Sequence, residues 1–171
     1  MKRKVNPMDY AKEIMMALPK GILMTTKVGE KVNTMTIGWG TLGVEWGKPV
    51  FIAFVREHRH TYQMVEANGE FTINVPLGEY DKNIISICGT KSGRDMDKIQ
   101  ELGLTLEESE VISVPGLKEL PLTLECKVIY KQAQEFKNLE PVSRDRYYSE
   151  TIPGDNHVAY YGEIVNAYIV E

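Results

Sequence analysis

The feature that most constrains the fold is a series of strand-like segments that follow one another with few helices between them. The clearest is residues 122–131, in which apolar and polar side chains alternate throughout, so we predict a strand with one face in water. Further strands are predicted at residues 22–27, 31–39, 49–56, 70–75 and 158–170. Helices are predicted at residues 6–18 and 60–68, with two short ones between residues 79 and 103. This order favours a mainly β (α+β) fold, an antiparallel sheet closed into a small barrel with flanking helices, over a doubly wound parallel sheet.

Residues 38–43, GWGTLG, have the letters of the GxGxxG dinucleotide-binding fingerprint and follow a predicted strand. That fingerprint works only where its last glycine opens a long helix, whose N-terminus receives the pyrophosphate. Gly47 and Pro49 follow within six residues, so no such helix is expected there. The sequence therefore predicts no Rossmann-type nucleotide site.

The CGTKSG string at residues 88–93 is not a Walker phosphate loop, because that pattern needs four residues between its glycines and a Gly-Lys-Ser/Thr end. It leaves Lys91 among small residues, with Arg94 just beyond. Two interpretations stay open: exposed amides that form an anion-binding nest, or a solvated loop that caps a helix.

The 171 residues predict one domain spanning residues 1–171, because domains usually contain about 100–200 residues. The longest apolar run, residues 50–55, is far shorter than the ~20 residues that cross a bilayer. Asn6, Pro7 and Asp9 directly follow the basic start MKRK, so no apolar signal segment is expected there and we predict a cytoplasmic protein without membrane contact. A net charge of −4 argues against non-specific nucleic-acid binding, which requires a broad basic surface.

Residues 33–40, NTMTIGWG, make an unusual end to a strand. Side chains alternate between the two faces of a strand, so hydroxyls and glycines gather on the side opposite Asn33, Met35 and Trp39. Glycine leaves main-chain N–H groups uncovered. The string therefore predicts a place where a ligand approaches the backbone closely, with core packing as the alternative interpretation of Trp39 and Trp46.

The strongest local charge lies at residues 56–61, REHRHT, where a buried strand meets a predicted helix N-terminus. A phosphate there would receive hydrogen bonds from guanidinium groups, from the Thr61 hydroxyl and from free helix amides. An exposed turn that pairs with acidic residues is the alternative.

Other kinds of chemistry have little support in the sequence. His58, His60 and His157 come with neither HExxH spacing nor the usual carboxylate that orients a ligating histidine, so we predict no metal site. No GxSxG elbow occurs, nor a Cys near a His, so nucleophilic hydrolysis is not predicted. Cys88 and Cys126 have no CxxC spacing and lie among apolar residues, which indicates buried free thiols.

Seven short strings occur in one order along nearly the whole chain. They are N-x-MT-x-GWG (33–40), P-V-x-I-x-F-V-R (49–56), R-x-T (59–61), EFTINV (70–75), CG-x-x-SGRD-x-DK (88–98), LECKV (124–128) and H-x4-GEIV (157–165). Each string alone is weak, but the ordered set resembles the flavin reductase-like FMN-binding proteins, specifically the flavoredoxin branch. The resemblance implies the FMN-binding split-barrel fold, an antiparallel Greek-key barrel with added helices, with FMN held at the interface of a homodimer.

The resemblance also implies which residues hold the cofactor. Against the flavin ring it places five residues of the NTMTIGWG string: Asn33, Met35, Thr36, Gly38 and Trp39. Near the ribityl phosphate it places Arg56, Arg59 and Thr61, with Lys91 as a companion, and it places His157 near the ring. His58 and His60 stand where the family more often has a small polar residue and a Tyr, and His58 is included among the cofactor-binding residues.

The implied function is that of an FMN-dependent oxidoreductase. Tightly bound FMN would take electrons from NAD(P)H as a transient reductant and pass them to free flavin, ferric iron or a redox partner protein. No catalytic side chain is predicted, because the cofactor carries the chemistry. The alternatives are an FMN-binding electron carrier or sensor that does not oxidise NAD(P)H directly, and a structural dimer without cofactor.

The strength of flavin binding bears on the expected assembly. Three charge-assisted hydrogen bonds to a phosphate supply on the order of 5–8 kcal/mol, whereas micromolar binding needs about 8 kcal/mol and nanomolar binding about 12 kcal/mol. Burial of the ring must supply the rest. A barrel of about six strands is filled by its own side chains, so the ring must lie outside it, and a second subunit is the simplest cover. We therefore expect a homodimer.

Overall fold

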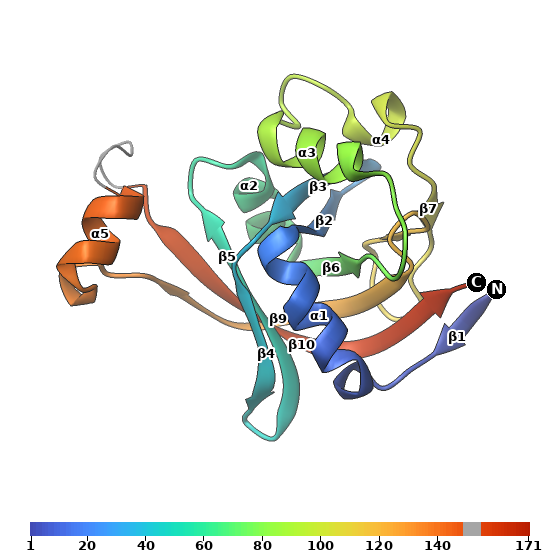
Figure 1. Cartoon of the computed structure of the whole chain (residues 1–171), viewed down its shortest axis with the longest axis horizontal. Helices are drawn as coiled ribbons and strands as arrows, with labels where there is room; N and C mark the ends of the chain where they lie inside the picture. The colour runs from blue at the N-terminus through green and yellow to red at the C-terminus, as the bar shows by residue number, and fades with distance from the viewer. Residues whose placement is uncertain (149–154) are drawn as a thin grey trace.

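The computed structural model describes residues 1–148 and 155–171 (Figure 1). The strands are β1 Lys2–Lys4, β2 Ile22–Val28, β3 Lys31–Ile37, β4 Gly40–Glu45, β5 Lys48–Arg56, β6 Glu70–Val75, β7 Leu106–Glu107, β8 Gly116–Leu117, β9 Leu122–Ala133 and β10 His157–Val170. The α-helices are α1 Ala11–Ala17, α2 His60–Asn68, α3 Lys82–Thr90, α4 Lys98–Glu101 and α5 Pro141–Tyr148, and short 3-10 helices cover Pro7–Tyr10, Leu18–Lys20 and Phe136–Asn138. None of the described helices has the length and apolar character needed to cross a bilayer.

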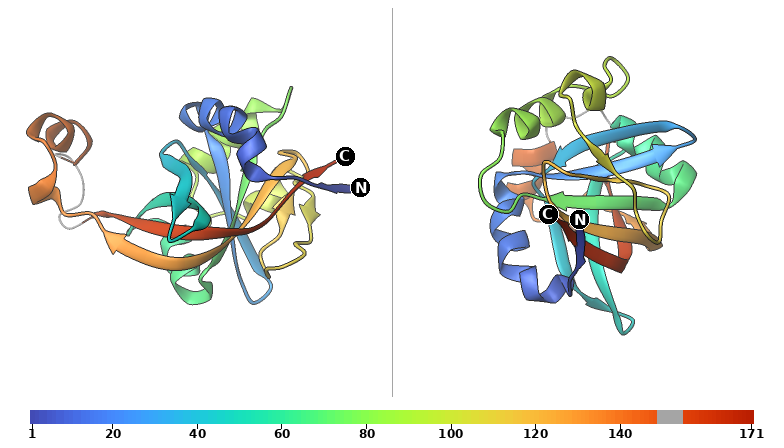
Figure 2. Two further views of the ribbon diagram at one scale, coloured as in Figure 1. Left: turned by 90° about the horizontal axis from the view of Figure 1, so that it is seen from below. Right: turned by 90° about the vertical axis from the view of Figure 1, so that its right-hand side faces the viewer.

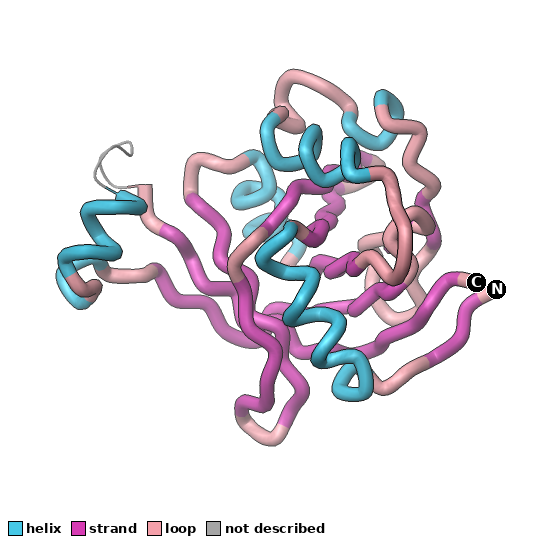
Figure 3. Tube along the Cα trace, viewed as in Figure 1, coloured by secondary structure: helices cyan, strands magenta, loops and turns pink. Residues whose placement is uncertain are grey.

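One antiparallel sheet forms the body of the molecule. Its strands are hydrogen-bonded in the order β3-β2-β6-β9-β10-β5-β4, and β1 pairs with β10. The edge strands β3 and β4 are consecutive in the sequence, and only Gly38 and Trp39 separate them. Because so short a link spans no more than about 11 Å, the sheet must curl until its two edges approach each other (Figure 3). The predicted fold class, a mainly antiparallel barrel with flanking helices, is confirmed.

Apolar side chains from several strands fill the barrel. Phe51, Phe71 and Tyr160 are among the largest fully buried side chains, and they belong to one core cluster. Ile14 and Leu18, from α1 and the turn that follows it, are buried in the same cluster, so α1 is held to the barrel by its apolar face. The interior is thus occupied by the chain's own side chains, as close packing requires.

The helix ends follow local signals in the sequence. Asn6 caps the first helical turn, because its side-chain oxygen accepts a hydrogen bond from the Met8 backbone N–H at 3.1 Å, and Pro7 follows at the first helical position. Gly69 ends α2 with φ 71°, a left-handed conformation that glycine adopts without strain. The predicted bounds of α2 and β6 are confirmed.

Other local predictions are wrong. Residues 88–90 form the last turn of α3 rather than a loop between helices. β3 ends at Ile37, two residues earlier than predicted, because residues 38 and 39 lead the chain directly into β4. The strand β4 and the helix α5 are not predicted at all, since β4 carries two glycines and no residue of α5 is buried, which hides the periodicity of both.

The strand β9 forms as predicted. The prediction that one of its faces is exposed to water is wrong near the start of the strand. Thr123 and Glu125 on that face are fully buried, because residues 108–117 pass over them. The Glu125 carboxylate accepts hydrogen bonds from the backbone N–H groups of Glu110 at 2.9 Å and Val111 at 2.8 Å. This carboxylate fastens the covering segment to the sheet.

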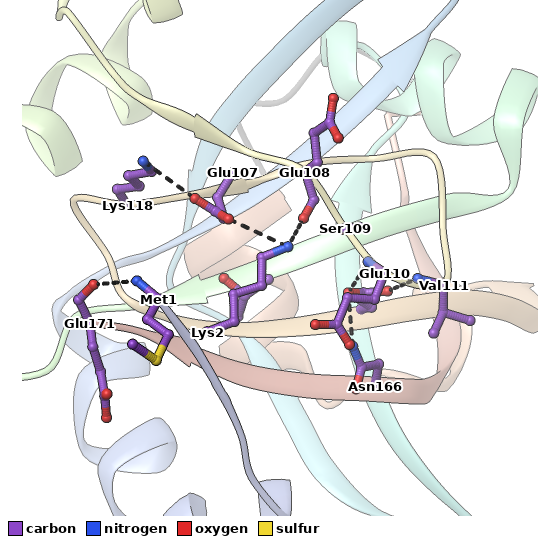
Figure 4. A network of polar contacts seen from close by, with 12 residues as sticks. Met1, Lys2, Glu107, Glu108, Ser109, Glu110, Val111, Lys118, Asn166 and Glu171 are labelled. Atoms are coloured by element: carbon purple, nitrogen blue, oxygen red, sulfur yellow. Dashed lines mark hydrogen bonds and ion pairs between the residues drawn. The ribbon is translucent and has the colours of Figure 1, made fainter.

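The two ends of the chain lie side by side at one end of the barrel (Figure 4). The Met1 amino group donates a hydrogen bond to the Glu171 carbonyl at 2.8 Å. The Lys2 ammonium donates to the Glu108 carbonyl and pairs with the Glu107 carboxylate at 3.4 Å. The Met1 contact joins the two chain ends, and the Lys2 contacts join β1 to residues 107–108, where the segment that covers β9 begins.

β9 and β10 continue beyond the barrel as a two-stranded arm, and the arm leads to α5 on the side away from the chain ends (Figure 2). The pairing register of these strands shifts between Tyr161 and Gly162, and such a bulge bends a strand. The arm brings α5 and the start of β10 next to the segment that joins β3 to β4.

Candidate functional site

A surface cavity of about 270 Å³ opens where β3 passes into β4. Its floor is formed by residues 35–39, and its walls are Phe54, Arg56, Arg59, Tyr147 and His157. A Cβ atom on Gly38 would meet only the Leu18 carbonyl oxygen, at 3.8 Å, which is an ordinary contact. Packing within the chain therefore does not require glycine at this position, and its absence of a side chain leaves the main chain bare toward the cavity.

A second cavity, of about 220 Å³, adjoins the first and shares Met35, Thr36 and Arg59 with it. Its walls come from the start of α2 and from the end of α3 with the loop that follows. Together the two cavities are lined by every residue that the sequence predicts for the cofactor site: Asn33, Met35, Thr36, Gly38, Trp39, Arg56, His58, Arg59, Thr61, Lys91 and His157. The fold brings these residues together from four separate segments: residues 33–39, residues 56–61, Lys91 and His157.

The second cavity, which we call the basic cavity, has an excess of positive charge. Its cationic side chains are Arg59, Lys91, Arg94 and Lys98, and no Asp or Glu is among its described lining residues. One nitrogen of the Arg94 guanidinium donates to the His58 carbonyl at 2.9 Å. Within residues 1–148 and 155–171, neither the Arg59 guanidinium nor the Lys91 ammonium makes a hydrogen bond or an ion pair. Free cations without a counter-charge favour the binding of an anion.

Lys98 is a member of this cavity that the sequence reasoning missed. It is only 4% exposed, and its ammonium donates to the carbonyls of Thr34 at 2.9 Å and Cys88 at 3.1 Å. Burial lowers the pKa of Lys98, because a charged group loses hydration there. Burial also raises the pKa of the Cys88 thiol, to about 11, which agrees with the predicted buried free thiol.

Arg56 lines the first cavity rather than the basic one, and it already has partners. Its guanidinium donates to the Asp155 carboxylate at 3.5 Å and to the Tyr147 carbonyl at 2.7 Å. Asp155 also accepts from the His58 backbone N–H at 3.1 Å and lies 2.7 Å from the His58 ring Nδ1. Burial opposes ionisation of Asp155, but these hydrogen bonds outweigh it and lower the pKa of the carboxyl. The structure thus separates Arg56 from the other residues predicted near the phosphate.

His157 stands at the far end of the first cavity, beside Trp39. The two ring centroids are 5.1 Å apart, and the His157 Nδ1 lies 2.7 Å from the Tyr148 hydroxyl. Burial and the neighbouring Arg56 charge lower the pKa of His157 to about 4. The imidazole is therefore neutral at pH 7.

Asn33 and Thr36 hold the walls of the basic cavity in place. The Asn33 side-chain amide donates to the Thr61 hydroxyl at 3.1 Å, and the Thr36 hydroxyl donates to the Ile85 carbonyl at 2.6 Å. A Cβ on Gly93 would lie 2.0 Å from the Asn33 side-chain oxygen, so only glycine lets the loop after α3 close over β3. The Thr36 hydroxyl has thus used its only proton, so toward a ligand it can act only as a hydrogen-bond acceptor.

A groove of about 810 Å³ adjoins the first cavity at Trp39 and runs between the barrel and α5. It is lined by the aromatic rings of Trp39, Phe54, Phe136, Tyr147, Tyr148 and Tyr161. Trp39 is 43% exposed and Trp46 is 56% exposed, so the interpretation of this pair as core packing is wrong. The sequence does not reveal the groove, because much of its lining comes from residues 132–148, which include the end of β9 and the unpredicted α5.

Comparison with known proteins agrees with this fold. The chain matches a family model described as a flavin reductase like domain over residues 15–171. In sequence it is similar to a protein of Archaeoglobus fulgidus, with 34% identity over 100 residues that cover 58% of this chain and 55% of that protein. The chain spans about half the length of the curated relatives it matches.

Solved structures show the same likeness. Flavoredoxin from Methanosarcina acetivorans is 27% identical, with 88% of this chain and 68% of that chain covered and a TM-score of 0.65. The FMN-binding domain of a flavin reductases-like enzyme from Shewanella baltica is 18% identical, with 99% and 77% covered and a TM-score of 0.69; at that identity the likeness concerns the fold alone. Since the family model covers nearly the whole sequence and the barrel agrees with it, the chain belongs to the flavin reductase-like family.

Proposed function

We propose that this chain is an FMN-binding oxidoreductase of the flavin reductase or flavoredoxin type. The observation that carries the proposal is the pair of adjoining cavities, one floored by bare main chain and the other lined by cations with no carboxylate among its described lining residues. A flat ring joined to an anionic tail suits such a pair. The similar solved structures, a flavoredoxin and an FMN-binding domain, support the same choice.

The phosphate of FMN would lie in the basic cavity. Arg59 and Lys91 are free to donate to it, and the Thr61 hydroxyl, which accepts from Asn33, keeps its own proton for a further hydrogen bond. The start of α2 adds backbone N–H groups, because its N-cap residue Arg59 supplies no side-chain cap. The residues present therefore fit a phosphate by charge and by donor number.

The isoalloxazine ring would lie along residues 35–39. When bound, FMN would accept hydride from a nicotinamide and pass electrons on to an acceptor. The chain's part is to orient the ring and to stabilise negative charge on it through main-chain N–H groups near Gly38. Trp39 and the neutral His157 would exclude water from one end of the ring without adding a charge there.

We also propose that the chain works as a homodimer in which a second copy covers the ring. The aromatic groove beside Trp39 leaves the first cavity open on that side. A second exposed aromatic cluster supports association: the ring centroids of Trp46 and Tyr130 are 5.6 Å apart, and those of Tyr130 and Tyr161 are 5.0 Å apart. Exposed apolar patches of this kind are typical of protein interfaces.

Titration of the flavin-free protein with FMN tests the binding proposal. Arg59→Ala should weaken FMN binding by about 10- to 100-fold, because it removes a charge-assisted hydrogen bond, and should leave riboflavin binding nearly unchanged. Arg3→Ala, which alters an exposed arginine paired with Glu171, is the matched control and should bind FMN like the wild type. Equal affinity of Arg59→Ala and wild type for FMN would show that the phosphate site is wrong.

Anaerobic mixing of the FMN-loaded protein with NADH and with NADPH tests the reaction. Loss of the oxidised flavin absorption with either reductant, followed by recovery on addition of free flavin or ferric iron, is expected for the oxidoreductase. A protein that both nicotinamides leave oxidised, but that a redox partner protein reduces, would instead be an electron carrier.

A further inference from the structure

His60 is a polar side chain that the proposed function leaves unexplained. It is the first residue of α2 and lines the basic cavity. Both of its ring nitrogens are shielded from solvent, and neither has a hydrogen-bond partner among the described residues. Because buried polar groups nearly always have a partner, the unpaired imidazole indicates that a ligand supplies one.

Positive charge surrounds this ring from three parts of the chain. Burial is the largest cause that lowers the pKa of His60, and the charges of Lys31 on β3, Arg94 after α3 and Lys98 on α4 lower it further. The other titratable groups that face the cavity are Arg59, Lys91, His58 and the Cys88 thiol. No carboxylate is among the described residues of its lining. In the free cavity at pH 7, His60 is therefore neutral.

A phosphate monoester reverses this balance. It carries about −1.5 to −2 charge at pH 7 and offers three acceptor oxygens. A nearby negative charge favours the protonated ring, and an acceptor favours its N–H groups, so both effects raise the pKa of a histidine beside it. A riboflavin without phosphate brings neither effect.

We propose that His60 takes up a proton from solvent when the flavin phosphate binds, and that it thereby selects a dianionic phosphate monoester. The inference rests on the proposed function, because it assigns a role within the same site. The ring is neutral in the free protein and cationic in the complex. Binding therefore takes up a proton when the pH lies between the pKa of His60 in the free protein and its pKa in the complex. FMN affinity then rises as pH falls through that window, by at most about tenfold per pH unit.

Calorimetric titration in two buffers of different ionisation heat counts the protons taken up on FMN binding between about pH 6 and pH 8. The flavin-free full chain should take up a fraction of a proton with FMN and none with riboflavin. His60→Gln keeps a polar amide but cannot titrate, so proton uptake and its share of the pH dependence should disappear. Gln63→Ala, at an exposed position of the same helix, is the matched control and should behave like the wild type.

A second ligand separates the protein's proton from the ligand's. The phosphate of FMN itself titrates with a pKa of about 6, whereas inorganic sulfate stays dianionic, so uptake on sulfate binding must come from the protein. The NMR signal of the His60 ring reports its pKa in the wild type with and without sulfate. This measurement does not depend on whether a variant folds. The expected result is a higher pKa with sulfate.

The outcomes distinguish the two proposals. Equal proton uptake by wild type and His60→Gln, or a His60 ring that titrates at one pH with and without sulfate, would overturn this inference. FMN that binds with no change at His60 removes this inference alone. Sulfate that shifts His60 in a protein that does not bind FMN removes the flavin proposal and supports the anion-linked proton uptake.

Discussion

Two histidines that line the candidate site are held by different kinds of partner. The His58 ring lies against the Asp155 carboxylate, whereas the His157 ring lies against the Tyr148 hydroxyl. Burial and the nearby Arg56 keep His157 neutral, so the end of the site near Trp39 gains no positive charge from this imidazole. The protonation of His157 is therefore coupled to folding.

Replacing His157 by Asn should make folding less sensitive to acid. The folded pKa of about 4 lies below the ordinary value of about 6.5, so between these values the unfolded chain binds a proton that the folded chain does not. Stability must then fall as pH falls, and the wild type should lose up to about 3 kcal/mol of unfolding free energy through this group. Urea unfolding of the flavin-free proteins between about pH 7 and pH 4 measures the effect.

Asp155 sets the baseline for that comparison. Its lowered pKa gives stability that is also lost in acid as pH falls through the folded value, and it is present in both proteins. The wild type should therefore show the steeper loss and the variant the shallower one. Parallel pH profiles would contradict the neutral buried state of His157.

Short strings of the sequence located the residues that gather around the two cavities, whereas contacts of these residues with FMN stay a prediction. The NTMTIGWG and REHRHT strings place their residues around two adjoining cavities. Lys98 was missed because a lysine in a polar string is normally solvated, and only the packing of α3 and α4 against β3 buries it. Asp155 was missed because the approach of the residues before β10 to β5 is not visible in the sequence.

At the scale of elements, Glu125 is expected to hold the segment that covers β9. Glu125→Gln replaces an acceptor oxygen by an amide that faces backbone N–H donors. We expect the unfolding free energy to fall by about 1.5–3 kcal/mol, the usual worth of hydrogen bonds to a charged group. Denaturant unfolding measures this, and Glu45→Gln on the exposed strand β4 is the control that should change little. An unchanged midpoint for Glu125→Gln would exclude this role.

Gly162 tests the packing at the bulge of β10. A Cβ there would lie 2.5 Å from Phe71 Cζ and 2.8 Å from Cys126 Cβ, and neither neighbour has room to move within the core. Gly162→Ala should destabilise the fold by about 1–3 kcal/mol. Gly43→Ala meets nothing within 4 Å and should stay within about 0.5 kcal/mol of the wild type. Thermal unfolding of both variants measures the difference. Equal stability of Gly162→Ala and Gly43→Ala would contradict the close packing around Gly162.

The periodicity of apolar residues located most of the strands. It did not predict burial, or locate a helix, where these depend on contacts with another segment. The alternation of residues 122–131 located β9, but the burial of Thr123 and Glu125 depends on a covering segment that alternation does not describe. α5 has no buried residue of its own, so no apolar stripe marks it. Gly47 and Pro49 correctly indicated that no helix follows GWGTLG. An antiparallel hairpin of β4 and β5 occupies that part of the chain.

In solution the whole molecule is expected to contain two chains per particle. Light scattering should give a mass twice the 19.4 kDa of one chain, and dilution that separates the chains should weaken FMN binding, because the cover of the ring is lost. A particle of one chain that binds FMN equally well at all protein concentrations would contradict the proposed interface.

A crystal structure of this chain grown with FMN would show directly whether the two cavities hold the flavin. We expect the phosphate within hydrogen-bonding distance of Arg59 and Lys91, with the ring along residues 35–39 beside Trp39. A flavin bound elsewhere, with the cavities at β3 and at the start of α2 free of it, would contradict the account.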